Sequence, residues 1–137
     1  MEIYRSDTRV SRRAPGEWFI GSVWQDPIIE ASAPARVRAL RVTFAPGART
    51  AWHTHPVGQT LHVLQGLGLT QSRGGPLRSI RPGDTVWIAP GEEHWHGATP
   101  QTTMVHLAIQ EADESGTTAN WLEQVNESDY TAVPEAA

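Results

Sequence analysis

The chain has 137 residues, a length typical of one domain with a single hydrophobic core, and we treat residues 1–137 as that domain. Its net charge is −4 and its 11 basic residues are scattered, so a nucleic-acid-binding surface is not expected. There is no cysteine, which excludes disulfides, a thiolate nucleophile and sulfur ligands to a metal. All basic residues are arginine, and without lysine neither Schiff-base catalysis nor covalent attachment of pyridoxal phosphate is available.

Hydropathy along the chain bears on its location. No apolar run approaches the roughly 18 residues that a membrane-spanning segment needs. The opening residues 1–6 lack the apolar stretch of a secretory signal peptide. We therefore expect a cytoplasmic protein that has no membrane partner and acts on a small molecule.

Short alternating or β-branched runs between Gly/Pro turns predict a mostly β chain. The expected strands are residues 18–23, 36–44, 59–65, 66–72, 84–89 and 102–110. In the second strand Leu40, Val42 and Phe44 share one face, and in the last strand His106 and Gln110 do. Many short strands at even spacing predict a β-sandwich or barrel.

The C-terminal part of the chain follows a different pattern. Residues 117–127 are expected to form a short helix, because Trp121, Leu122 and Val125 recur at helical spacing. The sequence therefore predicts an all-β domain with a short C-terminal helix.

Six histidines lie between residues 53 and 106, and some of them have the spacing of metal ligands. Two residues apart on a strand, His53 and His55 point the same way and can bind one cation. Gln59 and His94 would complete the set from other elements. The sequence therefore predicts a metal site formed by His53, His55, Gln59 and His94, with two coordination positions open for water or substrate.

The charge of this ligand set points to the kind of chemistry. Three imidazoles and one amide oxygen are neutral, so a bound divalent ion keeps its full double charge and is a strong Lewis acid. No anionic ligand stabilises a trivalent ion, which favours polarisation of an alcohol or carbonyl over oxygen activation. Mixed nitrogen and oxygen ligands suit manganese, iron, cobalt, nickel or zinc.

These segments resemble the two sequence motifs of the cupin superfamily. Gly47 to Gly66 matches Gly-x5-His-x-His-x3-Glu-x6-Gly at every spacing, except that Gln59 replaces the glutamate. In the second motif the distance from Gly83 to His94 is right, but Pro90 is out by one place and Ala98 replaces the usual asparagine. The resemblance implies a cupin jelly-roll β-barrel with a metal in its mouth.

A closer resemblance extends nearly end to end. The sequence is similar to the small bacterial manganese-dependent hydroxynitrile lyases, and to cupins associated with carboxymuconolactone decarboxylase-like proteins. The segments that carry the resemblance are 44–56, 58–61, 90–97 and 106–111. It implies cleavage of cyanohydrins to an aldehyde or ketone and hydrogen cyanide, with the reverse addition, and it implies Mn²⁺ as the metal.

The same resemblance implies roles for three further residues. His106 would act as general base and acid, His96 would steady the departing cyanide, and Thr50 would act on substrate beside the metal. For both histidines the alternative is a structural role that supports the metal ligands. Whether His106 or another base first takes the hydroxyl proton is left open by the sequence.

The sequence is also compatible with two other functions, and it predicts an oligomer. The alternatives to a lyase are a cupin dioxygenase and a non-catalytic binding cupin. The first would need oxygen, and the second would tolerate loss of His106. We also expect a homo-oligomer, a dimer or tetramer, because Leu64, Leu67 and Leu69 place apolar side chains on both faces of their strands. His62, on the face opposite Gln59, is expected in packing or in an oligomer contact.

Overall fold

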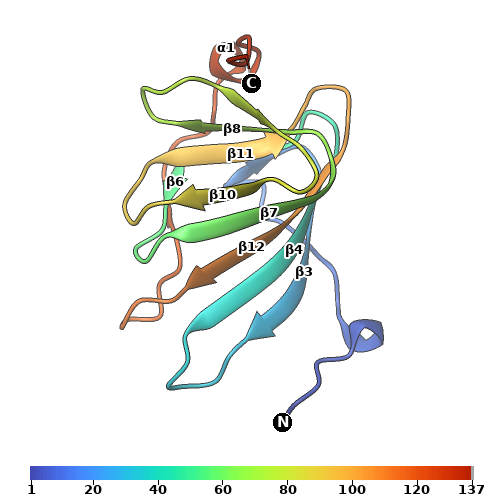
Figure 1. The fold of residues 1–137 in the computed structure, drawn as a ribbon, viewed down its shortest axis with the longest axis vertical. Coiled ribbons are helices and arrows are strands. Elements are labelled where there is room, and N and C mark those ends of the chain that lie inside the picture. The colour runs from blue at the N-terminus through green and yellow to red at the C-terminus, as the bar shows by residue number, and fades with distance from the viewer. Residues whose placement is uncertain (137) are drawn as a thin grey trace.

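The computed structural model describes residues 1–136, and its regular secondary structure is almost entirely β-strand (Figure 1). The longer strands are β3 (Val23–Glu30), β4 (Val37–Phe44), β7 (Gln59–Gly66), β8 (Gly68–Ser72), β10 (Thr85–Ile88), β11 (His94–Ala98) and β12 (Met104–Glu111). The short ones are β1 (Arg12–Arg13), β2 (Phe19–Ile20), β5 (Arg49–Thr50), β6 (His53–Thr54), β9 (Arg78–Ile80) and β13 (Asn120–Trp121). The helices are a 3-10 turn, η1 (Ser6–Thr8), and α1 (Glu127–Tyr130).

The strands form two antiparallel sheets. One has six strands in the order β1-β3-β4-β12-β7-β10. The other runs β13-β6-β11-β5-β2, with β8 pairing to β11 and β9 to β8. This is the jelly-roll fold expected from the sequence, in the form of two facing sheets and not of one closed barrel.

The core lies between the two sheets. Every second residue of a strand points inward, and the buried side chains of β7 follow that period. The fully covered members include Val23, Phe44, Leu61, Val63 and Met104. A second cluster, on the outer side of the seven-stranded sheet, contains Trp52, Leu69, Trp95 and Tyr130. Strand β11 is buried at every position, because the second cluster covers its outer side.

The predicted helix at residues 117–127 is wrong in position. The segment is extended, with β13 inside it, and the helix begins only at Glu127. The apolar residues are spaced as in a helix, but they do not form one helical face. Trp121 packs against Trp18 and Phe19, whereas Val125 lies in the second cluster. None of the helices among residues 1–136 is long and apolar enough to cross a membrane.

One glycine of the first motif has a clear structural role. Gly66 ends β7 with φ +77°, and a Cβ there would lie 1.8 Å from the carbonyl oxygen of Thr103. Only glycine fits this close approach, where the chain turns from one sheet into the other. The turn places β7 beside β12 and β8 beside β11.

Candidate metal centre and catalytic pocket

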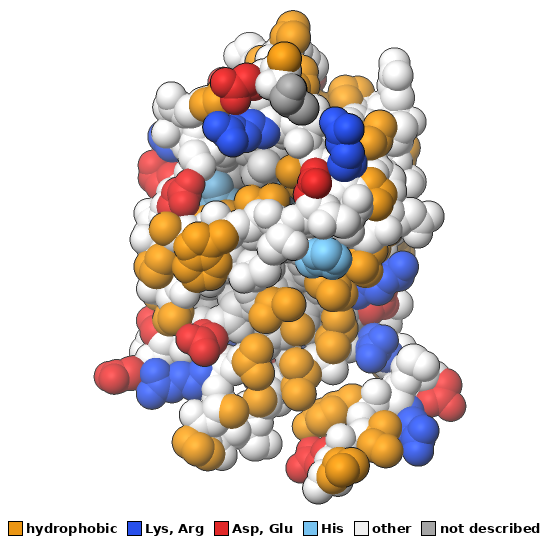
Figure 2. Space-filling model, viewed as in Figure 1, with side chains coloured by type: hydrophobic (Ala, Val, Ile, Leu, Met, Phe, Trp, Pro, Cys, Tyr) orange, Lys and Arg blue, Asp and Glu red, His pale blue; other side chains and the backbone are white. Residues whose placement is uncertain are grey.

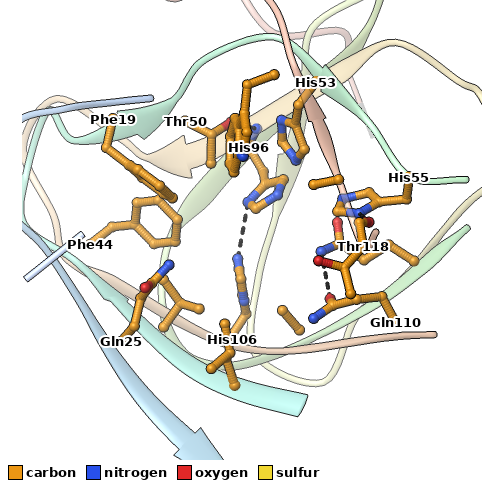
Figure 3. A pocket seen from close by; sticks show the side chains of 16 residues that line it. Phe19, Gln25, Phe44, Thr50, His53, His55, His96, His106, Gln110 and Thr118 are labelled. Atoms are coloured by element: carbon orange, nitrogen blue, oxygen red, sulfur yellow. Dashed lines mark hydrogen bonds between the residues drawn. The ribbon is translucent and has the colours of Figure 1, made fainter. Parts of the chain in front are cut away.

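Of the polar residues predicted for the site, all but His94 line one cavity between the sheets (Figure 3). The cavity has a volume of about 190 Å³. Both sheets contribute to its lining, and the side chains fall into a histidine-rich part and an apolar part. The histidine-rich part includes His53, His55, His96 and His106, and the apolar part Phe19, Val42, Phe44 and Trp121.

The strand pairing explains how distant histidines meet. His53 on β6 is the direct partner of His94 on β11, and their ring centroids are 4.2 Å apart. The turn after β6 carries His55, whose ring lies 5.0 Å from that of His53. Gln59 begins β7, on the opposite sheet. All four side chains are buried.

The Nδ1 atoms of three of these histidines face backbone carbonyl oxygens. The bonds run from His53 to Ala51 at 2.8 Å, from His55 to Thr118 at 2.7 Å and from His94 to Glu92 at 3.0 Å. A carbonyl only accepts, so each Nδ1 carries the proton and each Nε2 keeps its lone pair. This is the tautomer that a metal-binding imidazole requires, with the ring held by its other nitrogen.

Gln59 also has one side-chain atom held by a hydrogen bond and a possible ligand atom left free. Its Nε2 donates to Oε1 of Gln110 at 3.1 Å, which leaves its own Oε1 without a partner. The Nε2 atoms of His55 and His94 are likewise buried and without a partner among the described residues. An unsatisfied buried polar atom costs about 1–3 kcal/mol, and a cation bound by these lone pairs would remove that cost. The residues present therefore fit a divalent metal ion.

His96 is a second candidate for the third imidazole ligand. Ring nitrogens of His53, His94 and His96 lie within 4.8 Å of one another, so that trio also has the spacing of a metal site. His96 differs from His55 in the hydrogen-bond partner of its Nδ1 atom. The Nδ1 of His96 faces the Nε2 of His106 at 3.0 Å and not a carbonyl, so its tautomer is not fixed by the backbone.

The pair of His96 and His106 lines the same pocket. Both side chains are buried, and the edge of Phe44 packs on them, with centroid distances of 5.9 and 5.3 Å. Thr50, from β5, accepts a hydrogen bond from the backbone N–H of His96 at 3.2 Å and also lines the pocket. The three residues to which the sequence assigned catalytic roles are thus neighbours.

Burial controls the protonation of the histidines. Loss of hydration lowers the pKa of His94 and of His106 to about 4. For His53 and His96, burial and then the neighbouring imidazoles lower the pKa well below its usual value. These rings are therefore neutral at pH 7, as metal ligands and proton acceptors must be.

The fold and the site agree with the comparison to known proteins. Residues 40–110 match the model of the Cupin domain family. The chain is a cupin. It is 52% identical to an (R)-mandelonitrile lyase from Granulicella tundricola, over 95% of this chain and 98% of that protein.

Solved structures support the same assignment. A cupin-like protein from Thermotoga maritima matches with a TM-score of 0.81 and 39% identity, covering 86% of this cupin and 89% of that chain. The polyketide cyclase RemF from Streptomyces resistomycificus matches with a TM-score of 0.70, over 95% and 90% of the two chains. At 19% identity the second match shows a likeness of fold alone.

Several pocket residues of this cupin were not predicted from its sequence. Trp121 pairs with His53 across β13 and β6 and stacks on its ring at 4.6 Å. Thr118 holds His55, and Phe19 and Gln25 close the apolar end. No local signal marks them, since they reach the site through pairing between distant segments.

Proposed function

We propose that this cupin is a metal-dependent hydroxynitrile lyase. It would cleave aromatic cyanohydrins to an aldehyde and hydrogen cyanide, and would catalyse the reverse addition. The observation that carries the proposal is the histidine pair His96–His106 in the same cavity as the buried, unpaired ligand atoms of His55 and Gln59. The 52% identity to a protein named (R)-mandelonitrile lyase points to the same reaction.

In this proposal His53, His55, Gln59 and His94 hold the metal, for which we take Mn²⁺ from the family resemblance. When bound, a divalent cation at these ligands supplies the Lewis acidity that polarises the cyanohydrin oxygen. The carbonyl oxygens behind the three imidazoles hold the rings in place, so the ligands need little reorganisation.

Proton transfer falls to the histidine pair. If the Nε2–H of His106 donates to His96, the Nδ1 of His106 is a free base and the Nε2 of His96 carries a hydrogen. His106 Nδ1 then takes the hydroxyl proton as the bond between the carbinol carbon and the nitrile breaks. A proton passes from His106 to His96, and His96 Nε2 protonates the cyanide, which leaves with the bonding electrons as hydrogen cyanide.

Thr50 and the aromatic residues position the partners of this reaction. The Thr50 oxygen accepts from the N–H of His96, so its own hydrogen remains available to the substrate. Phe19 and Phe44 form an apolar wall suited to an aromatic ring. A cavity of about 150 Å³ is enough to hold benzene, and this one measures about 190 Å³.

The test of the chemistry is mandelonitrile cleavage under nitrogen by manganese-loaded protein. His106→Ala should keep its metal and lose about 10²-fold or more in rate, the usual scale for a general acid–base residue. His62→Ala is the matched control, because His62 lies outside the cavity and bonds Thr85. Equal rates in wild type and His106→Ala would remove His106 from the mechanism. Activity that requires oxygen would favour a dioxygenase.

The test of the metal site is elemental analysis of the double variant His53→Ala, His55→Ala. Wild type should bind one divalent ion per chain, and the double variant should bind none, because two of four ligands are lost. The control is again His62→Ala, which should keep its metal. Stoichiometric metal in the double variant would contradict the proposed ligand set.

A further inference from the structure

One polar side chain in the pocket has no role in the reaction proposed above. Gln25, on β3, lines the same cavity as the histidines but from its apolar end. Figure 3 shows its amide beside Phe44, on the side of the pocket away from His55. The other two glutamines of the pocket, Gln59 and Gln110, bond each other, whereas no hydrogen bond to the Gln25 amide occurs among residues 1–136.

The strand register fixes where Gln25 lies relative to the reacting groups. Gln25 is opposite Val42 on β4, and Val42 is opposite His106 on β12. The three side chains therefore point into the cavity from neighbouring strands. Two strand spacings of about 4.8 Å separate the backbones of Gln25 and His106 by about 10 Å. Both side chains therefore border the cavity, on either side of Val42.

The residues that line the cavity limit which substituent of the aromatic ring can bind the Gln25 amide. No residue that lines the cavity carries a carboxylate or a guanidinium. Arg12 is opposite Gln25 on β1, but it is exposed and does not line the cavity. An anionic substituent at the apolar end would therefore have no counter-charge within the cavity, which is costly. The Gln25 amide offers one acceptor and two donor hydrogens, which match a neutral hydroxyl that both donates and accepts.

We propose that Gln25 is a specificity residue for a phenolic hydroxyl, and that the preferred substrates are cyanohydrins of ring-hydroxylated aromatic aldehydes. This inference rests on the proposed lyase function and names the substrate class of its site. In this arrangement the cyanohydrin group of the substrate lies at the histidine end of the cavity. The hydroxyl on the aromatic ring lies at the other end, where it bonds the Gln25 amide.

Matched substrate pairs test the inference. The specificity constant kcat/KM is measured for mandelonitrile and for its 3- and 4-hydroxy derivatives. Wild type should prefer one hydroxylated isomer over mandelonitrile by about threefold to tenfold, the worth of one neutral hydrogen bond. Gln25→Leu, similar in size, should lose this preference, so that its specificity constants for the three substrates lie within about twofold of one another. Gln65→Leu, on an exposed position outside the cavity, should behave as wild type.

A binding measurement separates this inference from the lyase proposal. Calorimetric titration with benzaldehyde and with 3- and 4-hydroxybenzaldehyde requires no turnover. Wild type should bind one hydroxylated aldehyde about threefold to tenfold more tightly, and Gln25→Leu should bind all three alike. Preferences that are the same in both proteins would overturn the role of Gln25, even if cleavage proceeds. No cleavage together with a lost binding preference would overturn the lyase and retain the polar subsite.

Discussion

The neutral amide at position 59 is the residue that most distinguishes this site from the usual cupin ligand set. Its Nε2 is held by Gln110, and its Oε1 is without a partner, as are the Nε2 atoms of His55 and His94. In the proposed ligand set, four neutral ligands would leave the double charge of a bound ion uncancelled. The residue choice thus favours polarisation of a substrate oxygen over a change of oxidation state.

Replacing the amide by a carboxylate tests this charge argument. Gln59→Glu should keep one metal per chain and should lower the rate of mandelonitrile cleavage per bound metal by about tenfold or more, because the carboxylate cancels one positive charge. Metal content is measured by elemental analysis and the rate under nitrogen. Gln65→Glu makes the same change at an exposed position and should have no effect. An unchanged or raised rate in Gln59→Glu would show that the amide does not act through charge.

Among the elements, the extended C-terminal segment reaches the site from far along the sequence and contacts two of its histidines. Residues 117–125 run beside the turn at Trp52, with backbone bonds in both directions between Trp52 and residues 122 and 123. This pairing delivers the Thr118 carbonyl to His55 and Trp121 to His53. The segment is anchored by Arg49, which donates to the Val125 carbonyl and to Glu127.

Tyr130 is the outer anchor of this segment. It packs beneath the Arg49 guanidinium, 4.1 Å from its ring centre, and donates to the Ala98 carbonyl at 2.6 Å. Tyr130→Phe leaves that buried carbonyl without its donor and should lower the free energy of unfolding by about 1–2 kcal/mol. Urea denaturation measures the loss. Tyr4→Phe removes a hydroxyl that bonds only exposed Glu2, and it should be neutral. Equal midpoints for the two variants would contradict the anchoring role.

The sequence predicted those elements whose evidence is local. Strands β4, β7 and β12 form where alternating side chains predicted them, and the two predicted faces are buried at Val42 and Phe44 and at His106 and Gln110. Most of β3 was missed, since Asp26 and Pro27 lower its apparent strand propensity. Its pairing with β4 overrides this through a register shift between Pro27 and Ile29. Trp87, which we would place in the core from its size, is 62% exposed.

The candidate site divides in the same way. Motif spacing pointed to His53, His55, Gln59 and His94, because side chains at alternate strand positions share a face. The carbonyl partners of the imidazoles and the pocket wall formed by Phe19 and Trp121 depend on pairing across more than 60 residues, as between His55 and Thr118. Such contacts leave no periodic trace in the sequence, so only the structure places them.

At the scale of the whole molecule, the outer face of the six-stranded sheet bears on assembly. Trp24, Leu64, Trp87 and Ile109 point outward from four of its strands and are 36–62% exposed. Figure 2 shows hydrophobic side chains gathered over this sheet. Of the three leucines that led us to expect a homo-oligomer, Leu67 is also exposed, whereas Leu69 is buried in the second cluster, outside the space between the sheets. Large exposed apolar side chains are typical of an interface.

We predict that this face pairs two copies of the chain. Light scattering at micromolar concentration should give at least twice the 15.0 kDa of one chain. Leu64→Asp with Ile109→Asp should shift the mass to that of the monomer, because two charges would be buried in the interface. Leu122→Asp introduces a charge at an exposed leucine outside this sheet and should leave the mass unchanged. A wild-type mass of 15.0 kDa would rule out the assembly.

The buried histidines also make the stability of the metal-free protein depend on pH. In the folded chain, burial lowers the pKa of His94 and of His106 to about 4, whereas an unfolded histidine titrates near its ordinary pKa of 6.5. The unfolded state therefore binds more protons between these values, and stability is lost as pH falls from 6.5 towards 4. Each such imidazole contributes at most about 1.4 kcal/mol per pH unit within this window.

Urea denaturation of chelator-treated protein at pH 7.5, 6.5, 5.5 and 4.5 measures this dependence. The groups facing His106 are His96 and the uncharged Phe44, so no carboxylate offsets its protonation. The free energy of unfolding should be level above pH 7 and should fall steeply below pH 6. His106→Asn should show a shallower fall over the same range, because one titrating imidazole is gone, and His62→Ala should keep the wild-type slope, since His62 lies outside the buried cluster. A flat profile down to pH 4.5, or equal slopes in wild type and His106→Asn, would show that these rings are not held neutral by burial.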